Sequence, residues 1–169
     1  MSRGASSGPP RRRLRRVALL ACASLACAWL ATACRVATPF RGPGLDDDQG
    51  VRAEVPETVV VALTAGRIEV GGAGRFAARL DEVLSVLPAN DGLVAFTVRR
   101  ELFGSRVWTM SAWRDDDSLD RFLASPEHVR AVRDGGIPRS SVDFVRVALP
   151  KALLPLSWPQ AERLLADQP

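Results

Sequence analysis

The chain has 169 residues, of which 47% are hydrophobic and 25% are charged. This is the composition of an ordinary globular protein, and it excludes disordered, collagen-like and solenoid chains. The length can bury one core, but it leaves no room for a dinucleotide-binding fold beside a second domain, so large multidomain enzymes are excluded as well.

The formal charge of +4 is concentrated at the N-terminal end. Six arginines and no acidic residue precede Cys34, whereas the chain from Cys34 onward holds 17 basic and 19 acidic residues and has a formal charge of −2. Nucleic-acid binding needs a basic face on the folded body. We therefore expect no nucleic-acid partner.

An uncharged apolar segment covers residues 17–34 and follows a basic cluster at residues 11–16. This order is typical of an export signal peptide, and the segment is almost long enough for a retained membrane anchor helix. We assign residues 1–34 to an export signal or membrane anchor. The positive-inside rule then places the rest of the chain on the extracytoplasmic face of a bacterial cell membrane, tethered through this N-terminal segment.

Cys34 ends this segment in a run, Leu-Ala-Thr-Ala-Cys, that resembles the lipidation motif of bacterial lipoproteins, although Ala31 holds the place where leucine is usual. Lipidation at Cys34 and a plain end of the signal both stay open. All three cysteines lie in this segment, so the folded body has no pair for an internal disulfide.

Residues 35–56 hold three prolines, three glycines and no apolar period. This composition predicts a flexible linker.

Residues 57–150 show the periodicities of a folded domain. Apolar or β-branched runs predict four strands, and apolar stripes at helical spacing predict three helical stretches. The predicted strands are 58–64, 93–102, 107–113 and 142–149, and the predicted helices are 76–87, 119–123 and 126–134. This order defines an α+β, ferredoxin-like βαββαβ domain. Residues 151–169 form a C-terminal extension with a short helix over 158–166.

A βαββαβ domain places its helices on one face of the four-stranded sheet and leaves the opposite face uncovered. The strand at 58–64 is strongly apolar at Val59, Val60 and Val61, which indicates that both of its faces are buried. We expect a second copy of the chain to cover the bare face, giving a homodimer.

The second half of this domain resembles a known family. The runs Arg-Glu-Leu-Phe-Gly at 100–104 and Trp-Thr-Met-Ser-Ala-Trp at 108–113, followed by residues 118–123 and 125–128, are similar to antibiotic biosynthesis monooxygenase-like domains of the dimeric α+β barrel superfamily. The resemblance implies a pocket for a small apolar or aromatic molecule and a relationship to cofactor-independent monooxygenases. A non-catalytic dimerisation or structural module is the alternative.

His128 is the only histidine, so it is the candidate catalytic proton-transfer residue. Trp108 and Trp113 are five residues apart on one strand, so they point to opposite faces, and both are candidate ligand-binding residues. Arg100 is a third, for an acidic or phenolate oxygen. A packing role is the alternative for the histidine and the tryptophans, and simple exposure for the arginine.

Residues 72–77 match the G-x-G-x-x-A fingerprint of dinucleotide-binding proteins. The acidic residue and the parallel sheet that this fingerprint needs are missing, and the sequence holds no zinc-ligand spacing. We therefore expect no cofactor and no metal.

Overall fold

The structure is a computed structural model, and it describes residues 34–46, 48 and 50–167. The chain divides into two compact units, Met1–Cys34 and Arg35–Pro169, and the description below concerns the second. The predicted signal or anchor helix lies outside the described residues. Among the residues that are described, no helix is long and apolar enough to cross a membrane.

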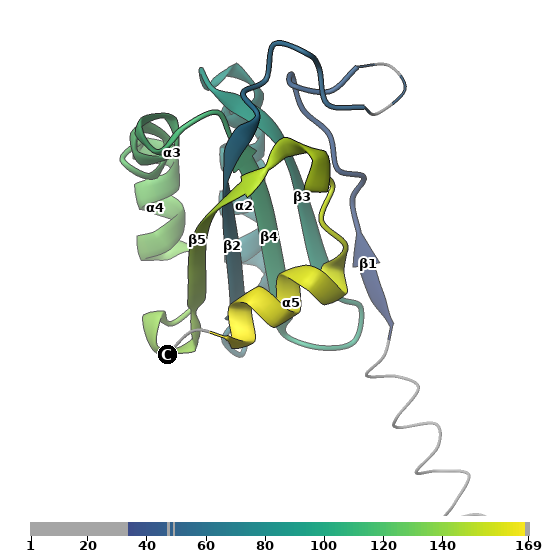
Figure 1. The fold of residues 1–169 in the computed structure, drawn as a ribbon. Coiled ribbons are helices and arrows are strands. Elements are labelled where there is room, and N and C mark those ends of the chain that lie inside the picture. The colour runs from purple at the N-terminus through teal and green to yellow at the C-terminus, as the bar shows by residue number, and fades with distance from the viewer. Residues whose placement is uncertain (1–33, 47, 49, 168–169) are drawn as a thin grey trace, which may run out of the picture. The chain divides into compact units, whose positions relative to one another are not determined.

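The second unit is built on one antiparallel sheet of five strands in the order β1-β3-β4-β2-β5 (Figure 1). The strands are β1 (Arg35–Ala37), β2 (Thr58–Arg67), β3 (Leu93–Glu101), β4 (Arg106–Trp113) and β5 (Asp143–Pro150). The helices are α2 (Ala73–Val86), α3 (Asp116–Leu123), α4 (Pro126–Asp134) and α5 (Trp158–Ala166). Short 3-10 turns cover Leu87–Ala89, Arg139–Ser141 and Lys151–Leu153. The predicted βαββαβ order is confirmed, from β2 to β5.

Local sequence signals fix where the helices begin. The Asp115 carboxylate accepts the backbone N–H of Ser118 at 2.7 Å and caps α3. Ser125 caps α4 directly before Pro126, whose missing N–H costs nothing at the first helical position. In α5, Ser157 and Gln160 form a reciprocal capping box.

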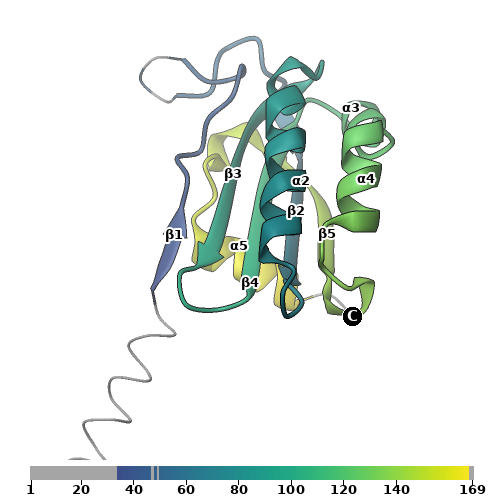
Figure 2. The same cartoon turned by 180° about the vertical axis from the view of Figure 1, so that it is seen from behind.

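Helices α2, α3 and α4 lie on one face of the sheet, which we call the helix face, and α5 lies on the other, which we call the α5 face (Figures 1 and 2). Each face has its own core. The helix-face core consists of Val60, Ala62, Val83, Leu87, Leu93, Phe96, Trp113, Leu119 and Phe122. The α5-face core consists of Leu45, Val55, Val59, Val61, Leu63, Val94, Ala95, Met110, Ala112, Val145, Leu156 and Ala161. β2 contributes alternate residues to both, as its apolar run predicts.

The expectation of a bare sheet face is wrong. Val59, Val61 and Leu63 are completely buried within the single chain. The C-terminal extension returns across the α5 face after β5 and packs its apolar side chains there, among them Trp158, Leu164 and Leu165. Because the chain covers this face itself, burial of the sheet gives no reason for two copies to pair through it.

The prediction of a flexible linker over residues 35–56 is also not met by the structure. Arg35–Ala37 pairs with Arg99–Glu101 as an edge strand, and Arg41 exchanges two backbone hydrogen bonds with Phe96 at 3.0 and 2.8 Å. Val55 is 2% exposed. Burying a side chain of this size stabilises a fold by about 1.5–3 kcal/mol, so the segment is part of the domain.

Two of the glycines that favoured the linker interpretation instead allow the backbone of this segment to pass close to β3. A Cβ atom on Gly42 would lie 2.4 Å from the carbonyl oxygen of Val94, and one on Gly44 would lie 2.7 Å from a methyl carbon of the same valine. Only residues without a side chain let the segment run this close to β3.

Candidate functional site

Two hollows in the described part of the chain lie on opposite faces of the sheet. The first, on the helix face, has a volume of about 350 Å³ and is open to solvent. It lies where the end of α2 and the turn after it meet β3 and the segment before β2. Its lining residues are Arg41, Gly42, Pro43, Leu84, Pro88 and Phe96. We call it the α2 hollow.

The α2 hollow is mostly apolar with one cation. Leu84 and Pro88 come from the helix side, and Phe96 forms the floor on β3. The Arg41 guanidinium lies over the Phe96 ring, 5.4 Å from its centroid. No ion pair to Arg41 is present within residues 34–46, 48 and 50–167. Its donors are thus available to an acidic oxygen, while the guanidinium stays within cation–π distance of the aromatic ring.

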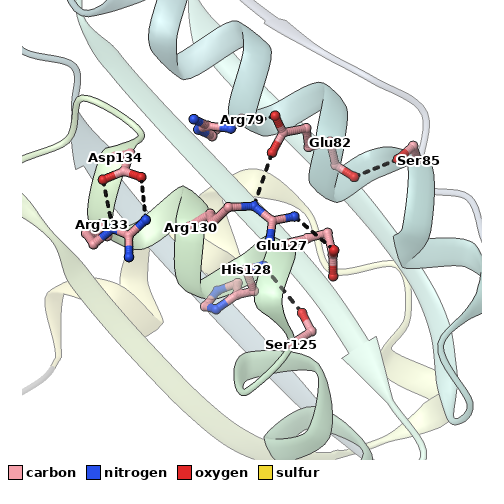
Figure 3. Close-up of polar contacts among 9 residues, drawn as sticks. All are labelled: Arg79, Glu82, Ser85, Ser125, Glu127, His128, Arg130, Arg133 and Asp134. Atoms are coloured by element: carbon pink, nitrogen blue, oxygen red, sulfur yellow. Dashed lines mark hydrogen bonds and ion pairs between the residues drawn. The ribbon is translucent and has the colours of Figure 1, made fainter.

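His128 lies in neither hollow. Its backbone N–H donates to Ser125 Oγ at 3.3 Å at the start of α4 (Figure 3). Its ring Nδ1 is 3.1 Å from the carbonyl oxygen of Leu123, and the ring is tilted against Phe122 with centroids 4.9 Å apart. Burial lowers the pKa of His128, and the bond to Leu123 opposes this only in part, so the environment favours the neutral ring. These contacts describe a residue that joins α3 to α4.

Above His128, an ionic network fastens α4 to α2 (Figure 3). Glu82 accepts from Arg79 at 2.6 Å and lies 3.7 Å from Arg130, which in turn binds Glu127 at 2.9 Å. The network lowers the pKa of Glu82, mainly through its bond to Arg79. Since all four side chains are half-exposed, solvent screens these pairs, and they orient the helices more than they stabilise them.

Trp113 belongs to the helix-face core. It is completely buried, stacks on Phe122 with centroids 5.0 Å apart, and donates from Nε1 to Ser111 Oγ at 2.9 Å. Trp113, Phe122 and His128 therefore form one continuous stack. Side chains fill this space, so the predicted cavity lined by Trp113 and reached by His128 is not among the two hollows.

Trp108 lies on the opposite face, as its spacing from Trp113 predicts, and is surrounded by cations. The guanidinium carbon of Arg99 lies 4.3 Å from the Trp108 ring centroid and 4.4 Å from that of Trp158 on α5. Arg35 and Arg106 each lie 5.0 Å from the Trp108 centroid. Arginine is well suited to such stacking because its guanidinium is planar and weakly hydrated.

Arg99 connects α5 to the sheet. It is 6% exposed, and its guanidinium donates to the Glu162 carboxylate, which also accepts from Arg35 at 2.8 Å. Burial lowers the pKa of Arg99, and the bond to Glu162 opposes that shift. The group nevertheless stays charged, because an arginine does not deprotonate in a protein. Arg99, Trp158 and Glu162 thus form an α5 latch.

The second hollow, of about 290 Å³, lies beside this latch between α5 and the sheet. It is lined by Ala65, Arg106, Trp108, Asp143, Glu162, Leu165 and Ala166. We call it the α5 hollow. Of the residues predicted to bind a ligand, Trp108 alone lines a hollow.

Arg100 is exposed and pairs with Val36 on the edge strand, whereas its neighbour Arg99 is the buried arginine. Cys34 is exposed and directly precedes β1. The sequence analysis missed Arg41 and Arg106, and of the two neighbouring arginines it chose Arg100 rather than Arg99. Within the part of the chain that the structure describes, no group of three or more His, Cys, Asp or Glu side chains could hold a metal ion.

The βαββαβ order and the antiparallel sheet define an α+β, ferredoxin-like domain. Residues 59–134 match the sequence model of the family described as antibiotic biosynthesis monooxygenase. This match confirms, for this part of the chain, the resemblance seen in the sequence. No curated protein matches the chain.

Several solved structures are similar to the chain. Rv0793 from Mycobacterium tuberculosis is 17% identical, with a TM-score of 0.47, over 53% of this chain and 92% of that one. A dimeric ferredoxin-like protein of unknown function from Jannaschia sp. CCS1 is 17% identical, with a TM-score of 0.46, over 53% and 97%. SnoaB, a cofactor-independent oxygenase from Streptomyces nogalater, is 17% identical, with a TM-score of 0.42, over 56% and 92%.

Proposed function

We propose that this domain binds a small apolar or aromatic molecule in the α2 hollow. The observation that carries the proposal is the lining of that hollow: Leu84, Pro88 and Phe96 offer apolar surface, and one cation, Arg41, stands over the aromatic floor. Sites of this kind combine apolar walls with few polar groups that fix orientation. An aromatic acid or phenolate, with its oxygen on Arg41 and its ring near Phe96, fits this arrangement.

The structure supports binding of a small molecule better than it supports an oxygenase reaction in which His128 is the general base. The histidine ring is held by Leu123 and Phe122, and neither hollow includes His128 in its lining. A general base must come within hydrogen-bond reach of the proton that it removes. We therefore assign His128 a structural role at the junction of α3 and α4, and treat monooxygenation, the activity that the family description names, as the competing hypothesis.

A filling substitution tests the binding proposal. Leu84→Trp places a large ring in the α2 hollow and should weaken binding of an aromatic acid such as naphthoate by about tenfold or more, as measured by calorimetry. Val132→Trp is the matched control, because Val132 is 45% exposed on α4 and lies outside the hollow. Arg41→Gln should weaken naphthoate binding while leaving naphthalene methanol unaffected. Equal affinities in all variants would contradict the proposal.

Oxygen uptake with a quinol tests the competing hypothesis. We expect the natural chain and His128→Asn to give the same background rate, because the asparagine amide can still donate to the Leu123 carbonyl oxygen. A rate above background that the substitution abolishes would show that His128 acts in catalysis.

The location of the domain is a separate proposal. The basic cluster and the apolar segment of residues 11–34 support export to the extracytoplasmic face of the membrane. Because β1 begins at Arg35, a lipid on Cys34 would leave no linker between the anchor and the sheet. Cys34→Ala should release or misprocess a lipoprotein, and unchanged membrane fractionation would favour a plain anchor.

Pairing of two copies is likewise a proposal. With the α5 face covered by the same chain, a dimer through the sheet requires α5 to move away. A non-catalytic dimerisation module, the alternative from the sequence, therefore needs another contact surface.

A further inference from the structure

The α5 hollow is independent of the α2 hollow, because the sheet separates them. Figure 1 shows α5 crossing one end of the sheet. The residues that line the hollow come from α5 and from strands β2, β4 and β5. Its volume of about 290 Å³ is at the small end of the range for ligand sites. Ala65, Leu165 and Ala166 supply apolar wall, and the remaining lining groups carry charge of both signs or belong to Trp108.

Strand register brings the charged groups together at the mouth of this hollow. Ala65 on β2 pairs with Trp108 on β4 and with Asp143 on β5, so these three residues form one row across the α5 face. In the next row, Arg67 on β2 lies directly opposite Arg106 on β4. Directly opposite side chains have Cβ atoms about 4.5–5.5 Å apart, and diagonal neighbours about 7–8 Å.

These charges have no partners of their own. In the described part of the chain, no side-chain hydrogen bond or ion pair engages the guanidinium groups of Arg67 and Arg106 or the carboxylate of Asp143. Arg106 rests on the Trp108 ring only. Two arginines directly opposite each other in a sheet repel, so an anionic group between them would be stabilising.

The other acidic groups in this region limit what can bind. Glu162 lines the hollow, but its charge is compensated by Arg35 and Arg99. Glu101 accepts the backbone N–H of Arg106 at 3.2 Å and forms no ion pair with its guanidinium. Asp143 on one side of the hollow would repel a purely anionic ligand. The two arginines on the other side would repel a purely cationic one. A ligand that carries both charges satisfies both sides.

We propose that the α5 hollow binds a small zwitterion of the α-amino acid type. Its carboxylate lies between Arg106 and Arg67, its ammonium group lies on Asp143, and its apolar side chain contacts Ala65 and Leu165. The Trp108 ring centroid lies 5.0 Å from the Arg106 guanidinium carbon, a contact that helps to hold this guanidinium at the hollow.

Three probes of the same shape test this proposal by calorimetry on the full-length chain in a mild detergent. L-leucine carries both charges, 4-methylpentanoate only the negative one, and 3-methylbutylamine only the positive one. We expect leucine to bind about tenfold or more tightly than either of the others. No leucine binding up to about 10 mM, or equal binding of leucine and 4-methylpentanoate, would overturn the proposal.

Two variants test which side chain binds the ammonium group of the ligand and which binds its carboxylate. Asp143→Asn should remove the preference for leucine over 4-methylpentanoate, and Arg106→Gln should remove the preference for leucine over 3-methylbutylamine. Arg121→Gln, on α3 at the other face of the sheet, is the matched control and should leave both preferences unchanged. Because Arg106 and Asp143 are at the surface of the hollow, circular dichroism should show unchanged folding. If either variant stays folded and keeps both preferences, the assignment is wrong.

The Leu84→Trp variant separates this site from the proposed function. It should lose naphthoate binding in the α2 hollow and keep leucine binding in the α5 hollow. Loss of both would contradict two independent sites.

Discussion

The two faces of the sheet are covered by different parts of the chain. The helix face is covered by α2, α3 and α4, all of which lie within the family match at residues 59–134. The α5 face is covered by the C-terminal extension and by Phe40, Leu45, Val51 and Val55 of the segment before β2, all outside that match. The matched region thus supplies strands β2, β3 and β4 and one helical layer, and the flanking segments add β1, β5 and the second layer.

The faces also differ in what holds their covering elements. On the helix face, half-exposed ion pairs connect α2 to α4 above a filled aromatic stack. On the α5 face, a buried arginine lies between two tryptophans and binds a carboxylate of α5. Buried charge makes the second contact more dependent on its partner, because a guanidinium that loses its carboxylate inside a protein stays desolvated.

The largest effect should come from removing the α5 cover. Deleting residues 151–169 exposes apolar groups of β2 and β5, each worth about 1.5–3 kcal/mol when buried. We expect the shortened chain to self-associate or aggregate, as measured by light scattering after gel filtration. The control is the full extension with Arg163→Gln, which alters α5 without uncovering the face. A shortened chain that stays monomeric and equally stable would contradict the claim that residues 151–169 cover the α5 face.

A smaller effect should follow from Glu162→Gln. The substitution removes the carboxylate that compensates buried Arg99, and we expect the free energy of unfolding to fall by about 1–3 kcal/mol in urea titrations. Glu127→Gln, in a half-exposed pair on the helix face, should cost less. If the two variants lose the same stability, the latch does not differ from a surface ion pair.

Ser125→Ala should cost about 1 kcal/mol, the usual value for loss of an N-cap hydroxyl. The loss should be visible as a lower urea midpoint, and Ser125→Asp should restore it because aspartate also caps helices. No loss in the alanine variant would mean that the Ser125 hydroxyl does not hold the start of α4.

The smallest effect concerns pH. Burial lowers the pKa of His128 in the folded state, so the unfolded chain binds the proton more readily. Stability is therefore present above the unfolded pKa of about 6.5 and falls as the pH drops below it, toward the folded pKa. Urea midpoints should decrease from pH 7.5 to pH 5.5, and His128→Asn should remove most of that decrease. An unchanged slope would place the histidine in solvent.

The elements of the family region follow from the sequence because periodicity and caps act locally. The five-residue spacing of Trp108 and Trp113 also predicted correctly that they lie on opposite faces of the sheet. Residues 35–56 could not be predicted in this way, since their contacts are with the edge and face of a sheet that forms from distant strands. A segment rich in glycine and proline has the same composition whether it is solvated or closely packed.

The choice between Arg99 and Arg100 shows a second limit of prediction from the sequence. Counting alternate residues from Leu93 places Arg100 on the same face as Trp108. The structure has a bulge between Leu93 and Ala95, which inserts one residue and shifts every later side chain to the other face. Arg99 therefore meets Trp108, in register with it, and Arg100 is exposed. A single extra residue in a strand leaves no signal in hydropathy.

Backbone hydrogen exchange in α5 tests the covered face most directly. If α5 packs on the sheet of its own chain, the amides of Ala161–Leu165 should exchange at least about a hundredfold more slowly than in an unstructured peptide, and the protection should not depend on protein concentration. Exchange of these amides at the rate of an unstructured peptide would show that α5 does not cover the face.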